Sequence, residues 1–235
     1  MQRILIVPAL LTTLGWAAAP GYAQDGKAGK TDSAKAAQES GKPSKAVDAG
    51  ADVSFLKDLT LRSASGESFS FATWFKGKDA KDADKSLYVL TFWSTDCPWV
   101  MQWNPDLGQL YQEYNGKGVQ FVAIDSNAGE VADASKVSKV AKEQKVPFPV
   151  LLDEGNKVAD WFGAKTTPQV YLIDGKGRVI YTGAIDNDAK DELAGAERKN
   201  YLKDAIDAAQ AGKAPATTST PATGCSIKRA KSAQP

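Results

Sequence analysis

The sequence predicts an α/β protein with a central mixed β-sheet flanked by helices and with an N-terminal β-hairpin extension. Two apolar runs, Leu87 to Trp93 and Val119 to Asp125, are rich in β-branched and aromatic residues and short enough to be buried strands. Two further runs, QVYLID and RVIYTGAI, flank Gly175-Lys176-Gly177, which predicts a hairpin. Helical patterns lie between these runs, and this order favours one mixed sheet between helices.

The first elements lie before residue 118. Apolar and polar residues alternate on both sides of Ser65-Gly66, so we expect a hairpin that runs into one helical turn near Trp74. After the first buried strand, Cys97 is followed directly by Pro98. Proline is tolerated in the first turn of a helix, because the missing N–H has no partner there. Cys97 is therefore expected to cap a helix that ends at Gly116 to Gly118.

The later elements complete the sheet and its cover. We expect a Lys-rich amphipathic helix from Val131 to Lys145, a short strand in VPFPVLLD, and a short helix from Asn156 to Phe162 closed by Gly163. The charged run from Ala184 to Arg198 is expected to be largely a solvated loop. A last helix, from about Asp188 to Ala209, should cover one face of the sheet.

The chain divides into four predicted segments. Residues 1–23 resemble a secretory signal peptide, with a basic start, an apolar core too short to span a bilayer and a cleavage site after Ala23. We therefore expect an exported protein, periplasmic or secreted, with no further membrane segment. Residues 24–50 are a predicted disordered linker, because they contain almost no large apolar residue. Residues 51–211 are the predicted folded domain, and residues 212–235 a flexible Pro/Thr-rich tail that carries Cys225.

Composition excludes several kinds of site. The chain has no histidine, which removes Ser-His and Cys-His catalytic pairs, His-containing zinc or copper sites and His-ligated haem. Its two cysteines and two methionines cannot form a thiolate metal site alone, so we predict no metal and no cofactor. With 29 basic and 28 acidic residues, the net charge of +1 gives no electrostatic reason to expect a nucleic-acid partner.

Cys97 is the first candidate for chemistry. At a helix N-terminus, unpaired backbone N–H groups and the positive end of the helix dipole favour the thiolate, which is the nucleophilic form of cysteine. The neighbouring Asp96 acts in the other direction, because a carboxylate beside a thiol disfavours a second negative charge. Trp99 is positioned either to line a substrate surface or merely to cover the helix.

Three motifs carry a resemblance to a known family. Phe92-Trp93, three residues and then Cys97-Pro98 match the active-site strand and turn of redoxins, Thr167-Pro168 before a strand matches their cis-proline loop, and GCSIK near the end carries a second cysteine. The chain from Val53 to Ala209 resembles the thioredoxin-like redoxins, specifically the exported TlpA-like and peroxiredoxin-like (AhpC/TSA) branch. This resemblance implies a thioredoxin-like fold, thiol redox chemistry at Cys97 and a cis-proline at Pro168 that packs against its sulfur.

The sequence departs from the thioredoxin pattern at two positions. A second thiol one helical turn after the first is needed for local dithiol exchange, and this position is Val100. The buried acid that thioredoxins place six residues before the cysteine corresponds to Thr91. Any resolving thiol must therefore come from elsewhere in the chain.

The peroxiredoxin pattern is met in part. Peroxiredoxins place a Thr or Ser three residues before the peroxide-attacking cysteine, and Ser94 satisfies this. Their proline seven residues before the cysteine is replaced by Leu90, and their arginine near the cis-proline-like loop is missing beside Thr166. Arg178 is the candidate in the later core to take its place.

The first hypothesis is an exported thiol redox protein, either a thiol-disulfide oxidoreductase or a thiol peroxidase. Cys97 attacks a disulfide or a small peroxide, and Cys225 then resolves the mixed disulfide or sulfenic acid. Ser94 donates a hydrogen bond to the thiolate or to bound oxygen, and electrons come from another thiol protein. The remaining candidate substrate-contacting residues are Trp99, Thr167 and Pro168.

The second hypothesis is a non-catalytic binding module on the same fold, with a structural disulfide between Cys97 and Cys225. The two cysteines lie 128 residues apart. In the chain-entropy model such a disulfide stabilises the fold by about 4–5 kcal/mol. The sequence leaves both hypotheses open.

Overall fold

A computed structural model of the chain describes residues 46–76, 85–193 and 195–230. The predicted signal peptide and residues 24–45 of the predicted linker lie outside these described residues. Within the described ranges, no helix is long and apolar enough to cross a membrane.

A mixed sheet of seven strands, in the order β2-β1-β5-β4-β3-β7-β8, forms the centre of the fold. β3 (Leu87–Trp93) is buried along its whole length, parallel to β4 (Val119–Asp125) and antiparallel to β7 (Gln169–Asp174). The predicted central strand is therefore confirmed. The other strands of this sheet are β1 (Thr60–Ser63), β2 (Ser68–Ser70), β5 (Val150–Leu152) and β8 (Val179–Gly183).

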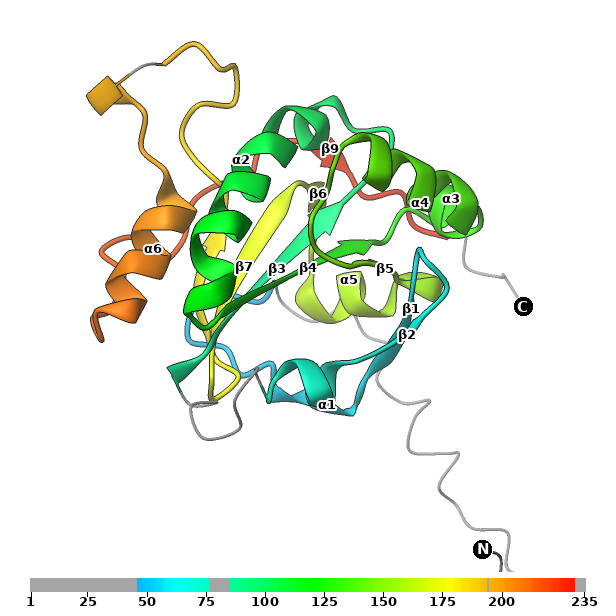
Figure 1. Ribbon diagram of the computed structural model, residues 1–235, viewed down its shortest axis with the longest axis horizontal. Helices are drawn as coiled ribbons and strands as arrows, with labels where there is room; N and C mark the ends of the chain where they lie inside the picture. Colours follow the sequence, from blue (N-terminus) through cyan, green and yellow to red (C-terminus); the bar gives the residue numbers. More distant parts are fainter. Residues whose placement is uncertain (1–45, 77–84, 194, 231–235) are drawn as a thin grey trace, which may run out of the picture. The chain divides into compact units, whose positions relative to one another are not determined.

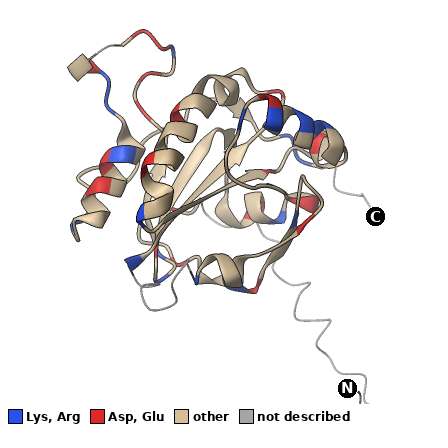
Figure 2. Cartoon of the chain, in the orientation of Figure 1, with Lys and Arg blue, Asp and Glu red and all other residues tan. Residues whose placement is uncertain are grey.

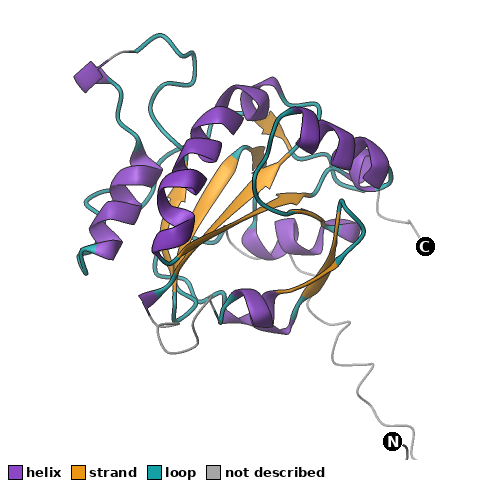
Figure 3. Ribbon diagram, viewed as in Figure 1, coloured by secondary structure: helices purple, strands orange, loops and turns teal. Residues whose placement is uncertain are grey.

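Helices cover both faces of the sheet (Figures 1 and 3). Successive side chains of a strand point to opposite faces, so β3 contributes to two hydrophobic cores. Val89 and Trp93 belong to the core beneath α2 (Pro98–Tyr114), α4 (Ala134–Glu143) and α6 (Tyr201–Gln210). Leu90 and Phe92 belong to the core beneath α1 (Phe71–Trp74) and α5 (Lys157–Phe162).

Two predicted helix starts are wrong for one physical reason, which is capping. The helix expected from Val131 is split into α3 (Ala128–Val131) and α4, because the Asp133 carboxylate accepts a hydrogen bond from the Lys136 N–H (3.1 Å) and begins a new helix. The helix expected from Asp188 begins only at α6, where the Asn200 side chain accepts a hydrogen bond from the Lys203 N–H (2.9 Å).

The segment before α6 folds around Arg198 and is not simply a solvated loop. The guanidinium donates hydrogen bonds to the carboxylates of Asp106 and Asp186, each at 2.8 Å. Asp186 is 2% exposed, and a buried carboxylate is stable only with such a partner. The expectation for this charged run is therefore corrected.

The C-terminal tail has fixed contacts that the sequence did not predict. β9 (Cys225–Ser226) pairs antiparallel with β6 (Thr166–Thr167) in a small second sheet, and Ile227 is buried in the core beneath α1 and α5. Earlier in the tail, the backbone N–H of Thr220 donates to the Thr182 carbonyl at 3.0 Å. The part of the tail that the structure describes, residues 212–230, is thus docked along the domain rather than free of it. Likewise, Val47 at the end of the predicted linker packs against the same core.

Candidate active site

Cys97 lies where the central strand meets the first long helix. It is the N-cap residue of α2, with extended backbone angles (φ −92°, ψ 113°), and Pro98 is the first residue of the helix, as predicted. Its side chain is only 1% exposed, and its thiol donates a hydrogen bond to the carbonyl oxygen of Thr167 at 3.0 Å. The thiol is therefore held against the loop that precedes β7.

This loop contains the predicted cis-proline. The peptide bond between Thr167 and Pro168 is cis, and both residues are buried. The structure thus brings together three of the residues that the sequence singled out, namely Cys97, Thr167 and Pro168, although they lie up to 71 positions apart in the chain.

The Cys225 thiol lies beside that of Cys97. Burial, the hydrogen bond to the Cys97 side chain and the electrostatic interaction with it raise the pKa of Cys225 to about 11. The backbone N–H of Trp99, which donates to the Cys225 sulfur, and the charge of Lys228 act in the other direction. Both cysteines are free thiols in the structure, and Cys225 is neutral near pH 7. The two thiols that the first hypothesis assigns to attack and resolution are therefore adjacent.

Ser94 makes contacts different from those expected. Its hydroxyl donates to the Glu130 carboxylate at 2.7 Å and accepts from the backbone N–H of Asp96 at 3.2 Å. These bonds direct Ser94 to Glu130, so its contacts give no support to the predicted role as a donor to the Cys97 thiolate.

Glu130 and Asp125 form a buried carboxyl pair that the sequence reasoning missed. Glu130 also accepts from the backbone N–H of Thr95, so it fixes the turn that leads to Cys97. Asp125 is fully buried at the end of β4, and burial together with the hydrogen bond and charge of Glu130 raises its pKa to about 8. Carboxyl ends of parallel strands meet at one sheet edge, so Asp125 at the end of its strand and Glu130 five residues later were the available signal.

The carboxylate of Asp96 forms an ion pair with a lysine. Lysine residues lie along α4 (Figure 2), and Lys136 of this helix binds the Asp96 carboxylate at 2.8 Å. Hydrogen bonds from this ammonium group lower the pKa of Asp96. The carboxylate is therefore charged but paired, which reduces the opposition to a thiolate that the sequence suggested.

The tryptophans near Cys97 differ in exposure. Trp93 is buried, as predicted, and its indole N–H donates to Asn104 at 3.0 Å. Trp103 is also buried and donates to Asp186 at 3.0 Å, whereas Trp99 is half-buried and packs at 6.1 Å between ring centroids from Trp103. Trp99 is thus the one of these three indoles with solvent-facing surface beside the cysteines.

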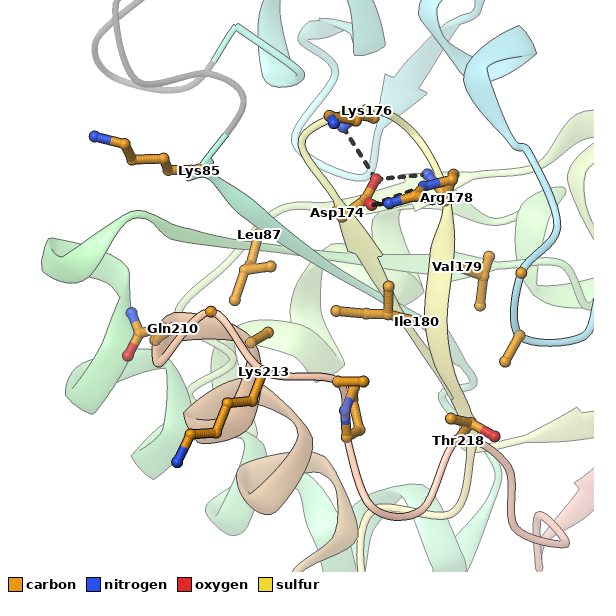
Figure 4. A pocket seen from close by; sticks show the side chains of 16 residues that line it. Lys85, Leu87, Asp174, Lys176, Arg178, Val179, Ile180, Gln210, Lys213 and Thr218 are labelled. Atoms are coloured by element: carbon orange, nitrogen blue, oxygen red, sulfur yellow. Dashed lines mark hydrogen bonds and ion pairs between the residues drawn. The ribbon is translucent and has the colours of Figure 1, made fainter.

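Arg178 does not reach the site. Its guanidinium donates to the Asp174 carboxylate at 2.9 and 3.0 Å in the turn between β7 and β8 (Figure 4). Asp174 pairs with Leu87 at the start of β3, and Cys97 follows the other end of that strand. The two ends of a seven-residue strand lie roughly 20 Å apart. The suggestion that Arg178 replaces the peroxiredoxin arginine is therefore wrong.

A cavity of about 850 Å³ lies beside Arg178, at this opposite end of the sheet (Figure 4). Its walls include Leu87, Ile180 and Lys213 but neither cysteine. It is separate from the thiol site.

Comparison with known proteins assigns the domain. The model of the AhpC/TSA family matches residues 56–182, which is more than half of the chain and includes Cys97 and the cis-proline loop. The chain belongs to the AhpC/TSA family. The resemblance seen in the sequence is confirmed, and this AhpC/TSA domain has a thioredoxin-like fold.

Relatives of known sequence or structure agree with the assignment. The thiol-disulfide oxidoreductase ResA of a Bacillus cereus strain is 31% identical over 117 residues, which cover 50% of this chain and 65% of that relative. The chain thus matches slightly less than two thirds of the relative's length. Crystal structures of an uncharacterized conserved protein from Geobacillus kaustophilus and of a hypothetical protein from Sinorhizobium meliloti 1021 are 28% and 29% identical, with TM-scores of 0.66 and 0.63. Each alignment covers 80% of this chain, and 94% and 97% of those structures respectively.

Proposed function

We propose that this AhpC/TSA protein is a thiol oxidoreductase in which Cys97 attacks and Cys225 resolves. The observation that carries the proposal is the position of the Cys225 thiol beside Cys97 at the cis-proline loop. The Cys97 thiolate attacks one sulfur of a disulfide and releases the other as a thiol. Cys225 then loses its proton and attacks the Cys97 sulfur, which forms the Cys97–Cys225 disulfide and releases the second thiol.

A protein disulfide is the favoured substrate over a peroxide. Peroxide activation needs hydrogen-bond donors beside the cysteine, but Ser94 donates to Glu130 and Arg178 to Asp174. The name of the ResA relatives, thiol-disulfide oxidoreductase, supports the same choice. A thiol or disulfide partner protein would supply or accept the electrons, and no cofactor is needed.

The deciding measurement is the reduction potential of the cysteine pair. The protein is equilibrated with thiol buffers, and the free thiols are counted by alkylation and mass. We expect a potential above about −250 mV, as in exchangeable dithiols. A value below about −300 mV, typical of structural disulfides, or cysteines that never pair, would contradict the mechanism.

Docking of the tail supports a second candidate function, a non-catalytic binding module in which a structural Cys97–Cys225 disulfide fastens the tail. Ile227 is 7% exposed, and Arg229 binds the Asp160 carboxylate at 2.7 Å, so the tail fastens to the domain even without a disulfide. A potential in the structural range together with an unreactive Cys97 would favour this function.

Export is a further part of the proposal and rests on the pattern of residues 1–23. Lasting or recycling disulfides belong to oxidising compartments, which fits a two-cysteine mechanism. When the full chain is expressed in a bacterium and recovered from the periplasm, its mass should correspond to a chain that begins at Gln24. Full-length protein retained in the cytoplasm would contradict export.

A further inference from the structure

The C-terminal tail occupies the edge of a short strand beside the nucleophile. β9 pairs with β6 so that Thr167 lies opposite Cys225, and the N–H of Ile227 donates to the Lys165 carbonyl at 2.9 Å. In Figure 1 β9 lies next to β6, at the end of the sheet where α2 begins. Main-chain pairing at such an edge accepts any extended chain, while alternate side chains give selectivity.

Three tail positions provide this selectivity. A Cβ on Gly224 would lie 2.0 Å from the Thr167 carbonyl oxygen, so the chain can approach the loop only with glycine there. Cys225 places its thiol beside Cys97. Two residues later, Ile227 is buried in the apolar core that also contains Phe162. The edge therefore fits the sequence Gly-Cys-x-aliphatic.

The same tail closes the site. Cys97 and Thr167 are each 1% exposed. A partner polypeptide cannot bring a disulfide onto a thiol buried to this extent while another strand is paired with the loop. The tail must therefore leave β6 before a large substrate reacts.

The contacts that hold the tail in the thiol form are reversible. Arg229 is about one-third exposed and donates to Asp160 and to the Ala164 carbonyl, and the Lys228 N–H donates to the side chain of Asn127 at 2.9 Å. No covalent bond fastens the tail while both cysteines are free. Exchange between a docked and a displaced tail is thus available to the reduced protein.

We propose that residues 224–227 are an internal stand-in for the substrate. In place of the displaced tail, an extended segment of a partner polypeptide with the sequence Gly-Cys-x-aliphatic pairs with β6 and brings its own cysteine onto Cys97. This inference rests on the proposed function, because it names the substrate of the same thiol. Cys97 attacks the disulfide that holds the partner's cysteine, and the returning Cys225 attacks the Cys97 sulfur and releases the partner as a thiol, so two thiols are oxidised and one disulfide is reduced.

The test is binding of the tail sequence in trans. A fluorescent peptide of residues 220–230 carrying Cys225→Ser is titrated into the reduced full chain, and anisotropy gives the Kd. The variant Gly224→Ala should displace the protein's own tail and bind this peptide at least about tenfold more tightly than wild type, because apparent affinity scales with the fraction of molecules that have a free edge. Gly108→Ala, whose added Cβ meets nothing within 4 Å, is the matched control and should behave as wild type.

Two altered peptides test the predicted sequence. Ile227→Asp would put a carboxylate in the apolar core, and methylation of the Ile227 backbone nitrogen removes the donor to Lys165. Both peptides should lose binding to the Gly224→Ala protein. Equal binding of these peptides and the parent peptide would overturn the proposal, and so would equal affinity of wild type and Gly224→Ala for the parent peptide.

A second variant covers the case in which Gly224→Ala does not fold. Arg229→Gln removes anchors at a partly exposed side chain and should tighten peptide binding several-fold; no gain would overturn the inference. The peptide has no thiol, so its binding is independent of the reduction potential. If the peptide does not bind while the reduction potential of the cysteine pair lies above about −250 mV, only this inference is overturned. A reduction potential below about −300 mV, typical of structural disulfides, overturns the proposed function.

Discussion

At the scale of single residues, the mechanism depends on Cys225, because the position one turn into α2 is Val100, which is buried in the core. Cys225→Ser should therefore stop the reaction after its first step. We expect Cys97 to accumulate as a mixed disulfide with a peptide disulfide substrate, detected as an added mass that is removed by reductant.

Cys97→Ser serves as the control for this trapping experiment and should gain no mass, since burial, the largest cause of the raised pKa of Cys225, remains and keeps that thiol protonated. If the Cys225→Ser protein turns over as fast as wild type, a thiol from outside the chain resolves Cys97 and the two-cysteine mechanism is wrong.

The contacts of Ser94 predict a structural effect rather than a chemical one. Ser94→Ala leaves the buried Glu130 carboxylate without one donor, which should lower the free energy of unfolding by about 1–3 kcal/mol. The rate at which Cys97 is alkylated should change less in Ser94→Ala than in Cys225→Ser. Urea unfolding and alkylation rates check this, with Ser94→Thr as the variant that retains the hydroxyl. A large loss of Cys97 reactivity with unchanged stability would restore the role expected from the sequence.

Asp125 predicts how stability varies with pH. Its pKa is raised to about 8 in the folded protein, so the folded state keeps a proton that the unfolded state loses above about pH 4. The contribution is fully present below the unfolded pKa and is lost as pH rises toward 8, with a slope of at most about 1.4 kcal/mol per pH unit. Urea unfolding at pH 5, 6, 7 and 8 measures this slope.

Asp125→Asn removes the titrating group while its side-chain oxygen can still accept from the Asn127 N–H. The difference between the two proteins cancels other buried carboxyls, such as Asp153, whose pKa is also raised by burial. We expect the variant to lose much of the slope. An identical pH dependence in both proteins would show that Asp125 is ionised in the folded state.

At the scale of elements, the tail depends on close backbone approach at β8. Gly183 has a positive φ of 139°, and a Cβ there would lie 2.2 Å from the Thr220 carbonyl oxygen. Gly183→Ala should therefore dislodge the tail and break the hydrogen bond from the Ala184 N–H to the Thr220 hydroxyl. The expected result is faster alkylation of Cys225, followed by mass, while Gly108→Ala leaves the rate unchanged. Slow alkylation of Cys225 in Gly183→Ala would mean that the pairing with β6 is sufficient to hold Cys225, without the contact at Gly183.

The elements that sequence could predict are those whose signal is contained in one stretch. β3 and β4 are continuous apolar runs, and the turn after Asp174 is marked by glycines, so all three were predictable. The starts of α4 and α6 depend on which of several polar residues caps the helix, and this is decided by geometry at Asp133 and Asn200. Pairing of the tail joins residues 58 positions apart, and no local pattern encodes it.

The site divides in the same way. Cys97 and Pro168 were predictable because each lies in a recognisable local motif, and the structure places them together. The contact of Ser94 with Glu130 was not predictable, because the two residues lie 36 positions apart and no local pattern shows that their side chains meet at 2.7 Å. The sequence suggested both cysteines but not that they are adjacent in the thiol form, which required the docked tail.

At the scale of the whole molecule, the tail ties the chemistry of the thiols to the stability of the fold. Forming the Cys97–Cys225 bond closes a long loop in the unfolded chain, and a structural clasp is expected to give about 5 kcal/mol for a loop of this length. The stabilisation and the reduction potential are linked, because 30 mV corresponds to about 1.4 kcal/mol for a two-electron couple. A Cys97–Cys225 disulfide with a reduction potential of −250 mV instead of −300 mV therefore stabilises the fold by about 2 kcal/mol less.

The oxidised and reduced forms of one protein thus separate the two hypotheses by stability alone. If the pair exchanges with substrates, the midpoint of urea unfolding should rise only modestly on oxidation, by the equivalent of about 3 kcal/mol or less. If the disulfide is a clasp, the oxidised form should gain the full amount. Cys97→Ser/Cys225→Ser, measured with and without reductant, is the control for effects of the reductant itself. Suppose that oxidation raises the free energy of unfolding by about 5 kcal/mol in wild type and not at all in the double variant. This result would contradict the redox mechanism and favour the binding module, because a disulfide stabilised by the full amount is too stable to exchange with a substrate.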